Sequence, residues 1–275
     1  GNQPRTRQLR FLVGGGDPFF PGIGLVDLFT TGSLPEACNA LRMHDHVFST
    51  FVGEFGGGQV VVLPFDPAEL VLDRRQATSS FYARRSRIPF ERVSLVAKAG
   101  IRKLVARSLE ILHHRRGLPY AHSWYYPRNE PTIFSLRVDT DNGTRQQVEE
   151  LYALSRRHTR PFSWFLDVES QQAYLSLFRE MADQEIGIHC FRHAPFGEAR
   201  EAIEDVGRAV TVFKAQGLPA RSFAAPFGLW NDGIEQAVEH FGFEYSSEFS
   251  YDDDNLPSHP PRGSGFHEAL QLPVH

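Results

Sequence analysis

Residues 132–144 read TIFSLRVDTDNGT, and this stretch decides how the C-terminal half of the chain folds. Its first seven residues are mostly apolar or β-branched, which predicts a strand over 132–138. Residues 139–143, DTDNG, follow the strand, and Asn-Gly is typical of a tight turn. Apolar positions then recur at three- and four-residue steps, which predicts a helix over 144–158. A strand, a turn and a helix in this order begin a parallel β/α unit.

The same alternation continues along the chain. Further strands are predicted at 162–166, 185–188, 222–225 and 243–245, and helices at 171–183, 196–216 and 230–241. Strands that alternate with helices of this length indicate parallel β/α units, so the expected fold class is α/β. In such folds the ligand site collects at the carboxyl ends of the strands. The residues that follow the predicted strands are therefore the candidates for chemistry.

The N-terminal part is predicted to form a separate domain, because a segment rich in proline and aromatic residues at 118–131 reads as a linker. A helix is expected over 92–114, and strands at 10–13 and 60–65 adjoin glycine runs. We therefore expect a smaller α/β layer domain of unknown role at 1–125, followed by a second domain at 126–275. Two possible ligand sites, a phosphate-binding loop after Val13 and a metal-chelating triplet at 44–46 (HDH), are less favoured than a turn and an exposed loop.

Composition narrows the class of protein and its partners. The 275 residues carry 29 basic and 33 acidic side chains, a formal net charge of −4, so no basic field attracts nucleic acid. No apolar run approaches the ~20 residues of a membrane helix, and the first residues lack the apolar core of a signal peptide. A cytoplasmic protein without a membrane span is expected, with a removed leader as the alternative. Cys38 and Cys190 lie too far apart in sequence to suggest a disulfide framework.

Carboxylates and imidazoles follow two of the predicted strands. Asp139 and Asp141 come after the first strand, and His189 and His193 come after the third. Taken alone, the acidic pair can be a turn with a helix cap and the histidines an incidental pair, although a helical turn would place both imidazoles on one face. Together, Asp141, His189 and His193 supply one oxygen and two nitrogen ligands, as in a catalytic zinc-like centre with an open position. Asp139 would then be free to act as general base towards a metal-activated water.

Two further strand ends suggest how a hydrolase site would be completed. The turn at 226–228, PFG, can expose the backbone N–H of Phe227 to a pocket, where it would stabilise an oxyanion. His275 is a candidate general acid, because its side chain titrates near neutral pH, and the alternative is that it is only a terminal residue. The chemistry indicated is hydrolysis of an amide or an ester.

In this order the motifs over residues 131–275 resemble those of the polysaccharide deacetylase family, also called the NodB homology domain or carbohydrate esterase family four. The resemblance implies a distorted β/α barrel and a divalent metal, with zinc the first choice and iron, cobalt, nickel or manganese as alternatives. The substrate implied is an N-acetylated amino sugar of a carbohydrate. The site residues carried over are Asp139 as base, Asp141, His189 and His193 as metal ligands, the Phe227 N–H on the oxyanion and His275 as acid.

Three features depart from the family pattern. The third motif usually carries an arginine that orients the base, and here its place is taken by Ala224 and Ala225. An arginine from elsewhere would have to replace it, and the candidates are Arg137, Arg192 and Arg221. Residues 244–248, EYSSE, stand where an Asp/Trp motif is usual, and the family is best known outside the cytoplasm. These features fit a branch that trims acyl groups from a surface polysaccharide sugar or its precursor.

Three functions remain open on the sequence. The first is an N-deacetylase, the second a deformylase or other amide hydrolase that uses the same site, and the third a non-catalytic relative that binds a glycan or a protein. Of the aromatic residues, Trp230 is expected at the rim of the site, where it could stack on a sugar ring. Trp164 lies inside a predicted strand and is expected in the core.

Overall fold

The computed structural model describes residues 51–73 and 98–274, apart from 64–65, 125, 132, 249–256 and 263–264, and gives the backbone alone for short strands between residues 7 and 94. The chain divides into two compact units. An N-terminal unit comprises 1–78, 93–125 and 251–256, and a C-terminal unit comprises 79–92, 126–250 and 257–275. The predicted boundary at residue 125 stays a prediction.

In the part of the N-terminal unit that the structure describes, there are antiparallel strand pairs and two helices. β1 (Arg7–Leu12) pairs with β2 (Leu25–Thr30), β3 (Leu41–Arg42) with β4 (Val47–Phe48), and β5 (Phe51–Phe55) with β6 (Gly58–Val62). The helices are α1 (Pro67–Val71) and α2 (Lys98–Arg115). The strand predicted at 60–65 is thus the second arm of a hairpin. The helix predicted from residue 92 begins only at Lys98, because residues 91–94 form a strand.

Along the chain, the structure describes four short strands between α1 and α2. They are β7 (Gln76–Ser79), β8 (Tyr82–Ala83), β9 (Ser86–Arg87) and β10 (Glu91–Ser94). β8 and β9 pair antiparallel, and β7 lies beside β10 in a second two-stranded sheet.

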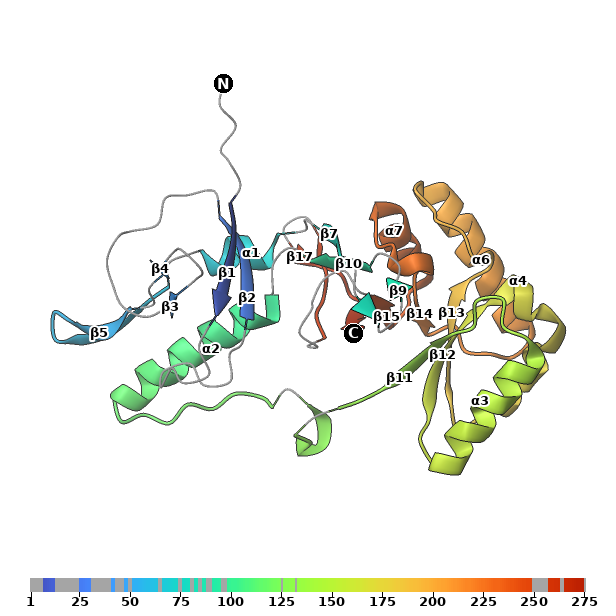
Figure 1. Cartoon of the computed structure of the whole chain (residues 1–275), viewed down its shortest axis with the longest axis horizontal. Coiled ribbons are helices and arrows are strands. Elements are labelled where there is room, and N and C mark those ends of the chain that lie inside the picture. Colours follow the sequence, from blue (N-terminus) through green and yellow to red (C-terminus); the bar gives the residue numbers. More distant parts are fainter. Residues whose placement is uncertain are drawn as a thin grey trace, which may run out of the picture. The chain divides into compact units, whose positions relative to one another are not determined.

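The C-terminal unit is built on one six-stranded parallel sheet with the order β11-β12-β13-β14-β15-β18 (Figure 1). Its strands are β11 (Leu136–Asp139), β12 (Phe162–Asp167), β13 (Glu185–Cys190), β14 (Ser222–Phe223), β15 (Tyr245–Glu248) and β18 (Leu270–Pro273). With helices in the connections, the sheet forms the half-barrel of a distorted β/α barrel, which confirms the predicted fold class. A short antiparallel hairpin, β16 (Pro261–Arg262) and β17 (Gly265–Phe266), precedes β18.

The helices of this unit follow their local sequence signals closely, with one exception. They are α3 (Arg145–His158), α4 (Val168–Gln171), α5 (Leu175–Glu180), α6 (Ala199–Ala215) and α7 (Asp232–Phe241), with 3-10 turns η1 (Pro127–Asn129), η2 (Gln172–Tyr174) and η3 (Pro226–Gly228). Thr144 caps α3 in a capping box with Gln147. The single helix predicted at 171–183 is broken instead, because the backbone of Tyr174 leaves helical geometry and its hydroxyl donates a hydrogen bond to the carbonyl of Gly143.

The core is centred on β12 and β13, which lie in the interior of the sheet. Trp164 is 1% exposed, which confirms its predicted core position. Gly187 lets these strands pack closely, because a Cβ there would lie 2.4 Å from the Ser222 hydroxyl and 2.8 Å from the Phe165 ring. The rim position predicted for Trp230 is wrong: its side chain is 4% exposed and faces the interior just before α7.

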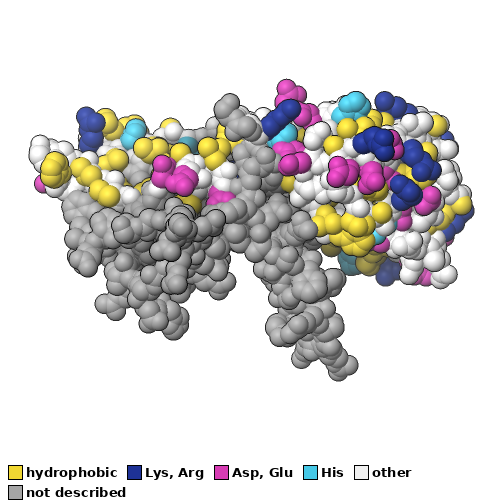
Figure 2. All heavy atoms as spheres, turned by 90° about the horizontal axis from the view of Figure 1, so that it is seen from above, with side chains coloured by type: hydrophobic (Ala, Val, Ile, Leu, Met, Phe, Trp, Pro, Cys, Tyr) yellow, Lys and Arg dark blue, Asp and Glu magenta, His cyan; other side chains and the backbone are white. Residues whose placement is uncertain are grey.

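The described surface is mixed in charge. On the face that Figure 2 shows, acidic and basic side chains of the C-terminal unit are interspersed rather than gathered by sign. Among the residues that the structure describes, no helix combines the length and apolar character needed to cross a membrane.

Candidate active site

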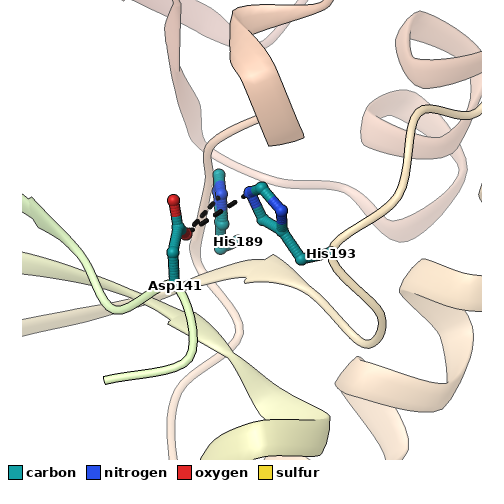
Figure 3. A group of neighbouring side chains, drawn as sticks. All are labelled: Asp141, His189 and His193. Atoms are coloured by element: carbon teal, nitrogen blue, oxygen red, sulfur yellow. Dashed lines mark ion pairs between the residues drawn. The ribbon is translucent and has the colours of Figure 1, made fainter.

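Three of the predicted residues come together at the carboxyl ends of β11 and β13. The Oδ1 atom of Asp141 lies 3.1 Å from Nε2 of His189 and 3.4 Å from Nε2 of His193 (Figure 3). All three potential ligand atoms lie within 4.8 Å of one another. Two segments almost fifty residues apart therefore supply one compact cluster, hereafter the Asp-His-His cluster.

The segment that carries the two histidines is a strand end followed by a bend, not a helical turn. His189 belongs to β13 and His193 to the loop after it. Asp205 of α6 shapes this loop, because its buried carboxylate accepts hydrogen bonds from the backbone N–H of Phe191, at 2.8 Å, and of Arg192, at 3.2 Å. The imidazoles meet because the loop folds back over β13, and their ring centres lie 5.0 Å apart.

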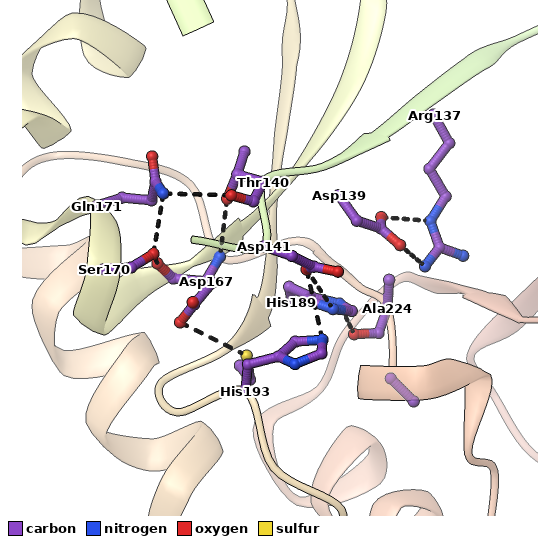
Figure 4. A network of polar contacts seen from close by, with 12 residues as sticks. Arg137, Asp139, Thr140, Asp141, Asp167, Ser170, Gln171, His189, His193 and Ala224 are labelled. Atoms are coloured by element: carbon purple, nitrogen blue, oxygen red, sulfur yellow. Dashed lines mark hydrogen bonds and ion pairs between the residues drawn. The ribbon is translucent and has the colours of Figure 1, made fainter. Parts of the chain in front are cut away.

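The turn that carries Asp141 is also held by side chains. The N–H of Gly143 donates to the carbonyl of Thr140 at 2.6 Å, and Asn142 adopts a left-handed φ of 53°. The amide of Gln171 donates to the carbonyl of Gly143 at 3.1 Å. The buried hydroxyl of Thr140 accepts from the N–H of Asp167 (Figure 4). Asp141 thus projects from a turn that is anchored on both sides.

The donor set fits a divalent cation. Nδ1 of His189 donates to the carbonyl of Ala224 at 2.8 Å, because a carbonyl can only accept, so Nε2 carries the lone pair. This Nε2 atom is buried, makes no hydrogen bond to any described residue, and faces a carboxylate oxygen across 3.1 Å. The Asp141 carboxyl is anionic at neutral pH, because the ordinary pKa of an aspartate is about 3.9. A cation that binds both Nε2 of His189 and the anionic oxygen of Asp141 would give this nitrogen the partner that it lacks among the described residues.

Asp139 lies beside the cluster and is held by Arg137 (Figure 4). The guanidinium makes two hydrogen bonds to the carboxylate, Nε to Oδ1 at 2.6 Å and Nη2 to Oδ2 at 2.5 Å. Its third nitrogen donates to the carbonyl of Ser247 on β15 at 2.6 Å. The other two candidate arginines are engaged elsewhere, Arg192 with Asp205 and Arg221 with Glu244.

Phe227 sits in the turn after β14 with a left-handed φ of 60°. The turn is closed by hydrogen bonds from the N–H of Gly228 to Ala225 and from that of Leu229 to Pro226. The Phe227 side chain is 54% exposed, and its ring centre lies 4.4 Å from that of His193. His275 lies outside the described residues, as do the loop after Val13 and the triplet at 44–46.

Three polar residues around the site were not anticipated. Asp205 shapes the histidine loop, Ser247 anchors Arg137, and Glu248 is fully buried and accepts a hydrogen bond from the N–H of Ala225. Burial raises the pKa of the Glu248 carboxyl to about 8. For Glu248 the sequence carried one signal, its position at the end of a predicted buried strand, because a buried glutamate needs a hydrogen-bond partner. Burial also raises the pKa of the Cys190 thiol, so this cysteine is an inert core residue.

Comparison with known proteins finds one matching family model, which covers part of the chain. Residues 132–246 match the family model "Polysaccharide deacetylase". A search of curated proteins found no significant match. Similar solved structures include a putative polysaccharide deacetylase from Mycobacterium smegmatis, with 18% identity, a TM-score of 0.48, and coverage of 56% of this chain and 63% of that one.

Two further structures have lower TM-scores. A probable polysaccharide deacetylase from Pseudomonas aeruginosa PAO1 has 22% identity, a TM-score of 0.42 and coverage of 49% and 46%. A CE4 family pseudoenzyme from Bacillus anthracis has 18% identity, a TM-score of 0.37 and coverage of 41% of each chain. The chain therefore spans less than two thirds of each of these proteins. The link to the polysaccharide deacetylase family therefore rests on the match of residues 132–246 to its family model.

Proposed function

We propose that the protein is a divalent-metal-dependent hydrolase that removes an N-acetyl group from an amino sugar of a surface polysaccharide or its precursor. The observation that carries the proposal is the Asp-His-His cluster together with a second carboxylate, Asp139, that a bidentate arginine holds beside it. A domain that only binds a ligand has no chemical need for that second carboxylate.

The Asp-His-His cluster would hold the cation, with zinc as the first choice for two imidazoles and one carboxylate. When bound, such a cation polarises a carbonyl and makes water a nucleophile at neutral pH. The chain contributes the rest of the arrangement. Ala224 fixes the tautomer of His189, and Asp205 folds the loop that brings His193 to it.

Asp139 is the proposed general base. Its carboxylate would accept the proton of the attacking water while Arg137 keeps both of its oxygens in place. Bidentate pairing restricts rotation of the carboxylate, so its aim does not depend on the substrate. Arg137 would thus take the part of the arginine that is absent before Pro226.

Phe227 and His275 are proposed for the second half of the reaction. The backbone N–H of Phe227 would donate to the oxyanion that forms on the substrate carbonyl, in a turn whose left-handed backbone is already set. His275 would protonate the leaving amine of the sugar. These two roles come from the resemblance of the 226–228 and 272–275 motifs to those of the family.

The test joins metal content with turnover. Wild-type protein, Asp141→Ala, His193→Ala and Asp139→Asn are assayed for bound metal and for release of acetate or formate from N-acetylated and N-formylated sugar oligomers. We expect about one metal per chain in wild type and in Asp139→Asn, loss of metal in the other two variants, and acetate release by wild type alone. Formate release without acetate release would make the enzyme a deformylase, and a wild type that binds no metal would refute the proposal.

A further inference from the structure

One peptide group links a buried carboxyl to the Asp-His-His cluster. The carbonyl of Ala224 accepts the hydrogen bond from Nδ1 of His189, and the N–H of Ala225 donates to Oε1 of Glu248, each at 2.8 Å. These two atoms belong to the same peptide group, and in a trans peptide they point in opposite directions. His189 is 1% exposed and the other three residues are 0% exposed, so water has no access to either contact.

We propose that Glu248 is a positioning residue for His189, which acts through the peptide between Ala224 and Ala225 and sets the affinity of the Asp-His-His cluster for a divalent cation. The inference rests on the proposed function for the identity of the cluster as a cation site. It assigns a task to a residue that neither the motifs nor the proposed mechanism uses.

The local structure shows why the peptide needs this partner. The N–H of Ala224 donates to the carbonyl of Ile188 on the neighbouring strand at 2.9 Å, and this hydrogen bond is the last one between β13 and the end of β14. Pro226, which follows Ala225, has no N–H to donate. A buried N–H without an acceptor is costly, so without Glu248 the Ala225 peptide would be free to tilt towards another acceptor. Such a tilt would move the carbonyl that orients His189.

Glu248 is itself rigidly placed. Its residue pairs with Pro273 across β15 and β18, and its carbonyl accepts from the N–H of Val274. Its second carboxyl oxygen is buried and makes no hydrogen bond to any described residue. Burial raises its pKa to about 8, so the acceptor is mostly the neutral acid at pH 7, a form that glutamine imitates. Hydrogen bonds in series polarise one another, which couples the acceptor to the imidazole.

The experiment measures zinc affinity of the full chain by chelator competition, in wild type, Glu248→Gln, Glu248→Leu and the control Glu244→Gln. Glu244 precedes β15, is exposed and pairs with Arg221, so its variant removes a nearby carboxylate without touching the peptide. We expect Glu248→Leu to weaken zinc binding by about 10-fold or more, as loss of partners behind a metal ligand does, and the other two variants to stay within about 3-fold of wild type.

A second readout separates orientation from general damage. The visible spectrum of the cobalt-loaded protein reports the geometry of the ligands, and we expect it to change in Glu248→Leu and to be kept in Glu248→Gln. Folding of each metal-free variant is checked by circular dichroism, and Glu248→Met replaces a leucine variant that does not fold. Wild-type affinity in a folded apolar variant, or an equal loss in Glu248→Gln, would overturn the inference. A wild type that binds no zinc would instead refute the proposed function, so the two failures are distinguishable.

Discussion

At the scale of single residues, Arg137 has three partners that lie far apart in the sequence. It holds both oxygens of Asp139, reaches the Ser247 carbonyl on β15, and lies 5.3 Å from the centre of the Phe165 ring. Because β11 is an edge strand and β15 lies near the opposite edge of the sheet, the contact with Ser247 bridges the two sides of the half-barrel. The proposed base is thus tied to two strands at once.

Replacement of Arg137 by lysine should lower turnover while leaving metal content unchanged. Lysine keeps the positive charge but cannot make the bidentate contact, and a carboxylate misplaced by about 1 Å can cost on the order of 100-fold in rate. The measurement is kcat with metal analysis, and Arg221→Lys, at an exposed pair, is the matched control. Equal kcat in the two variants would contradict the role proposed for Arg137.

Replacement of Gly143 by alanine should weaken metal binding and lower Tm. A Cβ at this position would lie 2.8 Å from the backbone carbonyl of Thr140, so the turn that carries Asp141 would have to open. Gly197→Ala is the control, because a Cβ there meets nothing within 4 Å. If both variants bind zinc as tightly as wild type, the turn is not what places Asp141.

At the scale of elements, the local sequence predicted those helices whose ends carry their own signals. α3 begins after Thr144 because the capping box satisfies its first N–H groups locally. The helix predicted at 171–183 is instead divided, since the side chains of Gln171 and Tyr174 donate hydrogen bonds to the carbonyl of Gly143. The spacing of apolar residues cannot predict a hydrogen bond to a residue about thirty positions away.

Helix α6 contributes to the site through one buried carboxylate. Asp205→Ala should reduce the free energy of unfolding by about 2–4 kcal/mol, because it leaves the N–H groups of Phe191 and Arg192 without their acceptor. It should also weaken metal binding, since the loop would no longer hold His193 against His189. Chemical denaturation and chelator competition test both effects. Glu201→Ala, at an exposed position on the same helix, should stay within about 0.5 kcal/mol of wild type.

At the scale of the whole molecule, Glu248 should make stability depend on pH. The pKa of this carboxyl is about 8 in the folded chain and 4.5 for the ordinary group, so between these values the folded state binds more protons than the unfolded state. The stabilising contribution is therefore complete below about pH 4.5 and is lost as pH rises through about 8. Relative to Glu248→Gln, the metal-free wild type should lose unfolding free energy from pH 5 to pH 9. Urea denaturation across this range measures the difference, and parallel curves for the two proteins would contradict it.

The sequence by itself determined the alternation of strands and helices in the C-terminal half and the placement of Asp139, Asp141, His189 and His193 at or just beyond the carboxyl ends of strands. These features follow from local periodicity and from the rule that parallel strands end at one edge of a sheet. Only the tertiary structure decided that Arg137 holds Asp139 and that Asp205 folds the histidine loop. It also decided that Glu248 accepts a hydrogen bond from the peptide group whose carbonyl binds His189. Each of these contacts joins residues from different elements, or depends on how a side chain is aimed once the strands have paired. Burial of Trp230 belongs with them, because whether a side chain faces the rim or the core depends on packing rather than on its neighbours in the sequence.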